Sequence, residues 1–432
     1  MTALKQHLGL FQTTMYGVGL ILGAGIYALI GDAAGAAGNS LWISFVLAAV
    51  ASVFTGLSYA ELSSMYPKAA AEYSFIKNAF KNNFVAFIVG WLTLFVAIIS
   101  AATIALGFGG YFADLFGVPI LIAAILVIVG LSFVNFFGIK ESSSMNVIFT
   151  IIEAAGLVLV IWIGFALFGN TQIDYFSAPH GLSGIFSAFT LVFFAYIGFE
   201  NIANIAEEIR NPKKVLPRAI ILSISITAII YILVSVSAIR VLNWEELDSS
   251  IAPLADVVKK ALGPQAQIVL SFIALFATTN TVLIMLISGS RILYGISKDN
   301  ALPAIFGIIH HQRKTPWIAV IIIGFLSIVF VFAGDITTIA NISVFTIIMV
   351  FILVNLSLIW LRYKEPNYER PFKSPLNVKK FPILAALGII TPVFGIIQLN
   401  PYVISMGIGV VASGALFYFL YNHLSKKSNL KS

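Results

Sequence analysis

The sequence predicts an all-α membrane protein of about twelve transmembrane helices, because its composition and its long uncharged apolar runs fit no water-soluble class. Of its 432 residues, 59% are hydrophobic and only 10% are charged, whereas a soluble domain carries roughly 25% charged residues. Runs such as Ile120–Phe137 hold no ionised side chain, and about 20 apolar residues in a helix span the hydrocarbon of a bilayer. The runs do not alternate between apolar and polar positions, so a transmembrane β-barrel is not expected.

The apolar runs divide the chain into twelve expected membrane spans within a single transmembrane domain, 1–432. The spans are expected at residues 12–37, 41–66, 83–112, 118–138, 145–168, 182–206, 216–241, 264–298, 316–334, 336–363, 381–398 and 401–423. The stretch 243–263 lies between the seventh and eighth spans, and it is expected to form one or two short amphipathic helices.

Positively charged residues are distributed unevenly between the two sides of these spans. With the N-terminus taken as cytoplasmic, only Arg240, Lys259 and Lys260 of the 25 Lys and Arg residues fall on the outer side. Lys and Arg concentrate in the cytoplasmic loops of membrane proteins, and a wrong helix count would scramble this alternation. The distribution predicts a multi-pass protein of the cell membrane with both termini in the cytoplasm. Because the basic residues lie in short loops, no nucleic-acid partner is expected.

The sequence does not favour an enzyme. It has no cysteine, which excludes disulfides and thiolate metal sites. Its five histidines fall in loops or at helix ends, and it contains no His-Glu-x-x-His motif and no phosphate-binding Gly-x-x-x-x-Gly-Lys motif. We therefore expect no catalytic residue, no metal and no cofactor. A channel, or a receptor that binds a solute without moving it, stays open as an alternative class.

Two of the apolar runs contain glycines near their middles, where glycine weakens a helix. The first run holds Gly23 and Gly25, and the sixth holds Gly198, followed by Glu200 and Asn201. The two runs are five helices apart and so cross the membrane in opposite directions, as in transporters built from inverted repeats with interrupted helices. At such breaks, free N–H groups attract an anion and free carbonyls attract a cation. This arrangement suits a zwitterionic α-amino acid, and close helix packing is the alternative explanation.

Several motifs around these breaks resemble those of the amino acid–polyamine–organocation (APC) permeases. The resemblance is carried by residues 19–27 (GLILGAGIY), 194–200 (FAYIGFE) and 207–219 (EEIRNPKKVLPRA), with shorter matches at 59–62 (YAEL) and 290–294 (SRILY). It implies a LeuT-type fold with discontinuous first and sixth helices, in which a five-plus-five inverted repeat is followed by two further helices. The repeats would cover about 12–168 and 182–363, and the last two helices 381–423. It also implies a secondary transporter that moves an amino acid by alternating access.

The same resemblance implies a substrate site built largely from backbone groups at the two breaks. The N–H groups assigned to the substrate carboxylate are those of Gly23, Ala24 and Gly25. The groups assigned to the α-ammonium are the carbonyls of Ile21, Phe194 and Ile197, with Gly198 at the break of the sixth helix. The Phe194 ring is expected to lie over the substrate as a gate.

Acidic residues within apolar runs are costly, so each needs an explanation. Many family members carry a lysine in the fifth helix, whereas the equivalent residue here is Glu153. We expect proton coupling through Glu153, with Glu200 as a second candidate, and a structural hydrogen bond between helices is the alternative for both. Sodium coupling stays open, with Thr278 and Thr279 as candidate ligands, because hard cations take oxygen ligands. Exchange of amino acids also stays open. Glu61, near the end of the second helix, is expected to reach the membrane interface.

The third helix is expected to form part of the pocket wall, together with the sixth, eighth and tenth. Its expected wall residues are Ile98, Ser100, Ala101, Ala102 and Thr103. This set contains no acidic residue of the kind that a cationic substrate would favour, so the expected substrate is a neutral amino acid. A cationic amino acid or polyamine is the less favoured alternative. The expected partners are thus the amino acid, a coupling proton or sodium ion, and the lipid bilayer.

Overall fold

The computed structural model describes residues 8–23, 25–68, 70–137, 142–167, 173–299, 301–311, 313 and 315–429. Its α-helices are α1 Leu10–Leu22, α2 Gly25–Ala37, α3 Leu41–Met65, α4 Ala71–Phe80, α5 Asn83–Phe116, α6 Ile120–Phe137, α7 Ser142–Trp162, α8 Gly181–Phe193, α9 Asn201–Asn204, α10 Pro212–Val241, α11 Trp244–Asp248, α12 Pro253–Leu262, α13 Pro264–Lys298, α14 Trp317–Val331, α15 Ile336–Lys364, α16 Ile383–Ile396 and α17 Pro401–Asn429. The shorter elements are η1 Gly38–Ser40, η2 Ile163–Leu167, η3 Phe194–Tyr196, η4 Ala206–Glu208, η5 Ala304–Gly307, β1 Asn377–Val378 and β2 Phe381–Pro382.

Twelve membrane-spanning units are present in the described part of the chain, as the sequence predicts. Nine apolar stretches there are long enough to cross a membrane, and the longest of them, Leu10–Met65, contains both of the first two expected spans. The shorter apolar helices α14 and α16 complete the set. The first span is α1 with α2, and the sixth is α8 with η3 and α9, so both are discontinuous. The protein therefore has the all-α transporter architecture that the resemblance implies, with two further helices at its C-terminal end.

Most helices begin and end within a few residues of the expected limits, and the larger departures have local causes. Helix α10 begins at Pro212 rather than at residue 216, because proline fits the first turn of a helix. The short helix α4 lies in an expected loop, where burial of Phe75 and Ile76 holds it against the bundle. Residues Asn377–Pro382 form an antiparallel hairpin that the sequence did not suggest, and α16 starts directly after Pro382.

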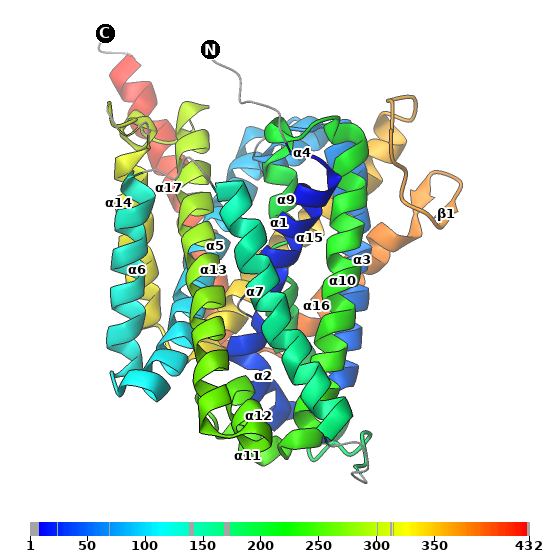
Figure 1. Ribbon diagram of the computed structural model, residues 1–432. Helices are drawn as coiled ribbons and strands as arrows, with labels where there is room; N and C mark the ends of the chain where they lie inside the picture. The colour runs from blue at the N-terminus through cyan, green and yellow to red at the C-terminus, as the bar shows by residue number, and fades with distance from the viewer. Residues whose placement is uncertain are drawn as a thin grey trace.

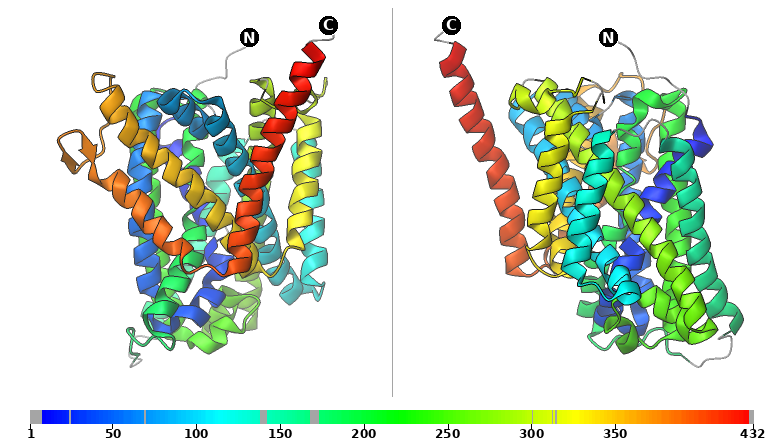
Figure 2. Two further views of the ribbon diagram at one scale, coloured as in Figure 1. Left: turned by 180° about the vertical axis from the view of Figure 1, so that it is seen from behind. Right: turned by 60° about the vertical axis from the view of Figure 1, so that its left-hand side comes forward.

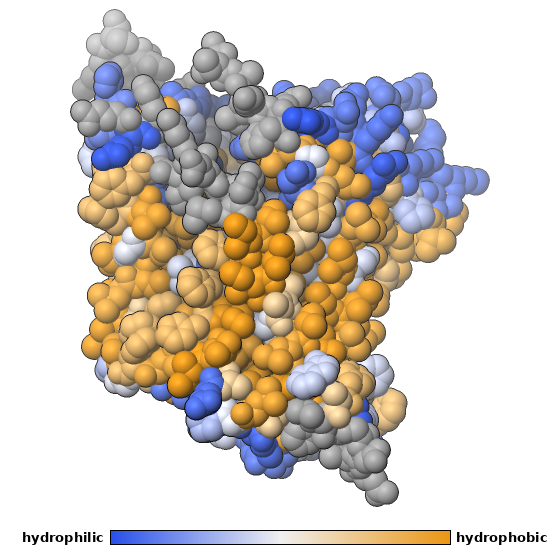
Figure 3. Space-filling view, in the orientation of Figure 1, coloured by the Kyte–Doolittle hydropathy of each residue, from blue (hydrophilic) through white to orange (hydrophobic). Residues whose placement is uncertain are grey.

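On the face shown in Figure 3, exposed apolar side chains form a broad band between two polar ends. The first residues of α1 and the last of α17 lie at one end, and α11 and α12 lie at the other (Figure 1). Helix α5 runs through the middle and packs against α6, α13, α14 and α15. Helix α17 lies on the outside of the bundle and leans away from it (Figure 2). A water-soluble protein could not expose such a band, so this is a multi-pass membrane protein.

A buried ion-pair cluster joins α3 to the segment that follows α15. Glu61 is fully buried, and its carboxylate accepts hydrogen bonds from Arg362 at 2.7 and 2.5 Å and from the Ser374 N–H at 2.8 Å. Arg370 also lies within ion-pair distance, at 3.2 Å. Whether Glu61 reaches the membrane interface stays a prediction, whereas its burial against two arginines is what the sequence did not reveal. Its partners are about 300 residues away in the sequence, so no local pattern could reveal them.

Replacing Glu61 by glutamine should destabilise the protein by about 3–5 kcal/mol, because two buried guanidinium groups would lose their counter-charge. Thermal unfolding in detergent measures the effect. The matched control is Glu369→Gln, which removes an exposed ion pair with Lys213; the side chains of Glu369 and Lys213 are 75% and 51% exposed. This substitution should change stability by at most about 1 kcal/mol. Equal effects of the two substitutions would contradict a structural role for the buried cluster.

Candidate functional site

The break in the first span separates α1 from α2 at Gly23. Neighbouring segments approach Gly23 and Gly25 so closely that neither position has room for a side chain. A Cβ atom on Gly23 would overlap the Thr281 hydroxyl of α13, and one on Gly25 would overlap the backbone of Ala195. The Gly23 N–H donates to the Gly19 carbonyl at 3.1 Å and so still belongs to α1. The N–H groups freed by the break are therefore those of the first turn of α2, which begins at Gly25. Ala24, which the sequence assigned to the same task, lies outside the described residues.

The break in the sixth span follows η3, where the chain becomes extended. Ile197 has φ −61° and ψ 130°, and Gly198 has φ +136°, a conformation that L side chains rarely adopt. The Phe194 carbonyl accepts from the Ile197 N–H at 3.1 Å. The Ile197 carbonyl takes no part in a helical hydrogen bond. Among the described residues, none donates a hydrogen bond to it. This break therefore presents carbonyl oxygen where the first presents N–H groups.

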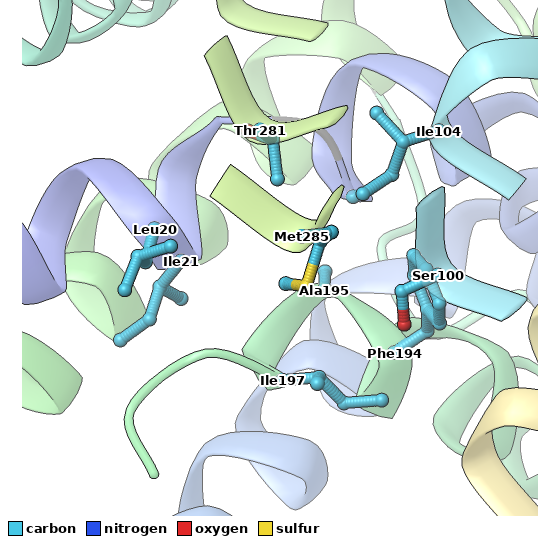
Figure 4. Close-up of a pocket in the computed structure, with 10 residues that line it drawn as sticks. Leu20, Ile21, Ser100, Ile104, Phe194, Ala195, Ile197, Thr281 and Met285 are labelled. Atoms are coloured by element: carbon cyan, nitrogen blue, oxygen red, sulfur yellow. The ribbon is translucent and has the colours of Figure 1, made fainter. Parts of the chain in front are cut away.

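The two breaks face one small pocket in the middle of the bundle (Figure 4). Its free volume is only about 10 Å³, room for about one water molecule, so the pocket is nearly closed and far smaller than the roughly 300–1,000 Å³ typical of ligand sites. Its lining comes from α1, α2, α5, η3 and α13, together with Ile197. The lining residues are Leu20, Ile21, Gly25, Ser100, Ile104, Phe194, Ala195, Ile197, Thr281 and Met285. None of these residues is ionisable.

The structure brings most of the sequence-predicted residues to this pocket. Four of them line it: Ile21, Gly25, Phe194 and Ile197. Gly23 and Gly198 flank it at the breaks. From α5, Ser100 lines the pocket as expected, and its hydroxyl is 2.9 Å from that of Ser343 on α15. The other expected residues of that helix, Ile98, Ala101, Ala102 and Thr103, are not in the lining, whereas Ile104 is.

Tyr231 of α10 is a functional candidate that the sequence did not reveal. Its hydroxyl lies within hydrogen-bonding distance of two carbonyls, that of Ile21 before the first break and that of Ala195 before the second, the latter at 3.1 Å. Because a hydroxyl has one hydrogen, it donates to one carbonyl at a time. A buried tyrosine hydroxyl needs such a partner, and its place in the middle of an apolar helix was the available signal. Tyr231 thus links the two interrupted helices directly.

Glu153 is buried on α7, close to the first break but outside the pocket lining. Its Oε1 accepts a hydrogen bond from the Asn280 side chain at 3.3 Å, whereas its Oε2 has no hydrogen-bond partner among the described residues. Its backbone carbonyl accepts from the Tyr27 hydroxyl at 2.9 Å. Asn280 directly precedes Thr281, which lines the pocket, so one turn of α13 contacts both the carboxylate and the break.

The candidate sodium ligands on α13 are arranged differently from the expectation. The Thr278 hydroxyl donates to the Ala274 carbonyl of its own helix at 2.7 Å, and Thr279 is only partly buried. Thr281, rather than either of these, approaches Gly23. Within the described residues, no group of three or more His, Cys, Asp and Glu side chains that could hold a metal ion is found.

Glu200 braces the second break. Its Oε2 accepts from the Gly198 N–H at 2.8 Å and its Oε1 from the Asn201 side chain at 3.0 Å, so both oxygens are used close to the break. Asn201 in turn accepts from the Ser288 hydroxyl of α13 at 3.3 Å. The carboxylate thus holds the extended turn and ties it to a neighbouring helix.

A further buried carboxyl group, that of Glu72, lies on α4 outside the membrane spans and next to α9, which follows the second break. It is 2% exposed and accepts a hydrogen bond from the Tyr59 hydroxyl at 3.3 Å. Next to it, the Ala71 N–H donates to the Asn204 side chain of α9 at 2.7 Å. Burial raises the pKa of Glu72 from 4.5 to about 7, and hydrogen bonds from its own backbone, Asn204 and Tyr59 oppose the increase.

The Glu72→Gln variant should show a weaker pH dependence of stability. A carboxyl group with a raised folded-state pKa stabilises fully below its unfolded pKa, and this contribution is lost as the pH rises through the folded pKa. Between about pH 4.5 and 7, wild-type stability should therefore fall by up to about 3 kcal/mol relative to the variant. Thermal unfolding in detergent from pH 5 to 8 measures it, with the exposed Glu369→Gln as control. Parallel wild-type and Glu72→Gln curves would contradict the assignment.

Comparison with known proteins identifies the family. A family model described as "Amino acid permease" matches residues 8–421. The branched-chain amino acid permease BcaP of Bacillus subtilis (strain 168) is 30% identical, and the alignment covers 99% of this chain and 95% of that protein. The methylthioribose transporter of the same organism is 28% identical over 97% and 94% of the two chains, and the human cystine/glutamate transporter is 30% identical over 98% and 87%. The chain therefore belongs to the amino acid permeases of the APC superfamily, which are multi-pass membrane transporters of amino acids.

Proposed function

We propose that this permease is a secondary active transporter that moves a neutral α-amino acid across the cell membrane by alternating access. The observation that carries the proposal is the pocket between the two helix breaks, whose lining has no ionisable side chain. The first turn of α2 offers N–H groups to the substrate carboxylate, starting at Gly25. The carbonyls of Ile21, Phe194 and Ile197 offer oxygen to the α-ammonium group. The lining offers no charged group to the substrate side chain.

The chemistry of the lining narrows the substrate class. Ile104 and Met285 are apolar, and Ser100 and Thr281 supply hydroxyl groups without a charge. A cationic or anionic side chain would lie here without a counter-charge, which is costly in a buried site. The names of the related transporters differ too widely to choose a substrate, but the name of the branched-chain amino acid permease agrees with an apolar pocket. We therefore favour a neutral aliphatic amino acid over a polyamine or a cationic amino acid.

A binding screen of the purified protein tests this substrate class. Neutral aliphatic amino acids should raise the apparent Tm, by an amount that corresponds to about 2.7 kcal/mol at 100 times Kd, whereas lysine, glutamate and spermidine should not. Met285→Trp, which fills the pocket, should abolish the shift. Phe276→Trp places the same residue on the same helix where the side chain is 49% exposed, and it should retain the shift. Stabilisation by lysine or spermidine alone would overturn the proposal.

We further infer that transport is coupled to protons through Glu153. An ionised carboxylate at the centre of a membrane helix costs about 2.5–3.5 kcal/mol on insertion scales, and Glu153 is fully buried with one unpartnered oxygen. A proton on that oxygen removes the charge, and its release at one side of the membrane would link substrate movement to the proton gradient. Glu200 is the weaker candidate, because both of its oxygens already accept hydrogen bonds. The alternative occupant beside Glu153 is a sodium ion that also contacts Thr281, with Thr278 and Thr279 farther along the same helix.

In proteoliposomes, Glu153→Gln should abolish accumulation driven by a pH gradient but leave amino acid exchange, because glutamine keeps the shape and cannot release a proton. Wild-type uptake should respond to a pH gradient and not to a sodium gradient at equal pH. Undiminished pH-driven accumulation in Glu153→Gln would rule out this role for Glu153. Accumulation driven by sodium alone would replace the proton with sodium as the coupling ion.

We also infer that both termini lie in the cytoplasm and that the two repeats cover about 12–168 and 182–363. The start of α1 and the end of α17 lie at the same end of the bundle (Figure 1), which supports the first inference. The second is supported by the positions of the two breaks in corresponding helices.

A further inference from the structure

The hairpin between α15 and α16 carries a groove that is separate from the transport pocket. Val378 pairs with Phe381 in its ladder, and Lys379 and Lys380 form the turn between the two strands. Together with Tyr363 at the end of α15, these four residues line an open groove of about 430 Å³. The hairpin projects from the side of the bundle, next to the end at which both termini emerge (Figure 1).

The hairpin combines exposed apolar residues with uncompensated positive charge. Leu376 and Val378 are 65% and 59% exposed, and Tyr363 is 54% exposed. Lys379 and Lys380 are exposed, and among the described residues neither of them forms an ion pair.

The acidic groups of the same segment are engaged elsewhere. Glu365 accepts a hydrogen bond from the Tyr66 hydroxyl at 3.3 Å, and Glu369 pairs with Lys213. Among the described residues, no acidic side chain lines the groove, so the two lysines are available to an external anion.

The hairpin lies where a lipid headgroup would be. The segment projects at the boundary between the apolar band and the polar end of the molecule (Figure 3). Trp360 and Tyr363, both half exposed, mark the same level on α15, and Lys364 lies over the Trp360 ring at 5.2 Å. Tryptophan and tyrosine with a nearby lysine are typical of the membrane–water interface. At this level of the membrane, the exposed side chains of Leu376 and Val378 are expected to contact lipid acyl chains.

We propose that this groove binds the headgroup of an anionic phospholipid, with the phosphate between Lys379 and Lys380 and an acyl chain along Val378 and Phe381. A free phosphate ion or an acidic peptide would satisfy the lysines but would leave the apolar residues in water, so the lipid uses the whole surface. Basic segments next to a membrane helix attract anionic lipids. The proposal rests on the membrane location of the chain and not on its substrate or coupling ion.

Lipid binding here would act on a segment that is anchored to the core. The Ser374 N–H, two residues before Leu376, donates to buried Glu61 of α3. The hairpin is therefore fixed between the lipid at its tip and the Glu61 cluster at its base, and it continues directly into α16.

The absence of native cysteine permits a site-specific test. The full chain with Val378→Cys, labelled with an environment-sensitive fluorophore and placed in nanodiscs of neutral lipid, is titrated with spin-labelled phosphatidylglycerol or spin-labelled phosphatidylcholine. Quenching by the anionic lipid should need roughly 20- to 30-fold less lipid than quenching by the neutral one at low salt. In the Lys379→Gln/Lys380→Gln background this preference should disappear.

The matched control is Lys259→Gln/Lys260→Gln, a second pair of adjacent lysines on α12 at the opposite end of the molecule, which should leave the preference unchanged. Equal quenching by the two lipids, or a preference that survives loss of the hairpin lysines, would overturn the proposal. Competition by inorganic phosphate or by an acidic peptide at concentrations equal to the lipid would assign the site to that ligand and would equally overturn it. Because the readout is lipid contact and not transport, these outcomes are independent of the proposed substrate and coupling ion.

Discussion

The structure depends on how it pairs the backbone groups at two helix breaks inside the membrane. A buried N–H or carbonyl without a partner costs free energy, and in lipid there is no water to take its place. The protein pairs some of these groups with its own side chains: the Tyr231 hydroxyl lies against the carbonyls before both breaks, and Glu200 accepts from the Gly198 N–H. Gly25, at the start of α2, and Ile197 both line the pocket, and no described residue donates a hydrogen bond to the Ile197 carbonyl. A ligand with one anionic and one cationic group would pair with the backbone N–H groups and carbonyls that the protein itself leaves without partners at the breaks.

The buried carboxylates of this bundle meet the same constraint in different ways. Glu61 lies against two arginines, Glu200 is held by neighbouring N–H groups, and burial favours the protonated form of Glu72. Glu153 has only the Asn280 amide on one oxygen. The first three are therefore explained by contacts that the folded chain makes with itself. One oxygen of Glu153 has no partner among the described residues, and an external proton or cation would satisfy it. The coupling proposal therefore rests on Glu153 and not on the other three carboxylates.

The sequence was sufficient for those parts of the fold that depend on local composition. Apolar runs located the spans, and Gly23, Gly25 and Gly198 located both breaks, because few other residues fit such close approaches or a positive φ. What depends on contacts between distant segments was missed: the pairing of Glu61 with Arg362, the link made by Tyr231, and the hairpin after α15. The wall of α5 illustrates the same limit. Five candidates were proposed there between residues 98 and 103, yet only Ser100 of them lines the pocket, because each residue turns the helix by about 100° and its rotation is set by packing.

Backbone groups at the breaks and side chains in the pocket lining would have different tasks in binding, which bears on how one fold can serve different substrates. If backbone groups at the breaks hold the amino and carboxylate groups that all α-amino acids share, their recognition does not depend on which side chains surround them. Discrimination then falls to the few side chains that line the remaining space, above all Ser100, Ile104, Thr281 and Met285. Substitution of Ser100, Ile104 or Met285 alters the volume and polarity offered to the substrate side chain without touching the glycines at the breaks, whereas Thr281 also lies against Gly23. Substitution of Gly23 or Gly25 would force α13 or η3 apart from the first span, so these positions are constrained by the fold and by the shared part of the substrate together.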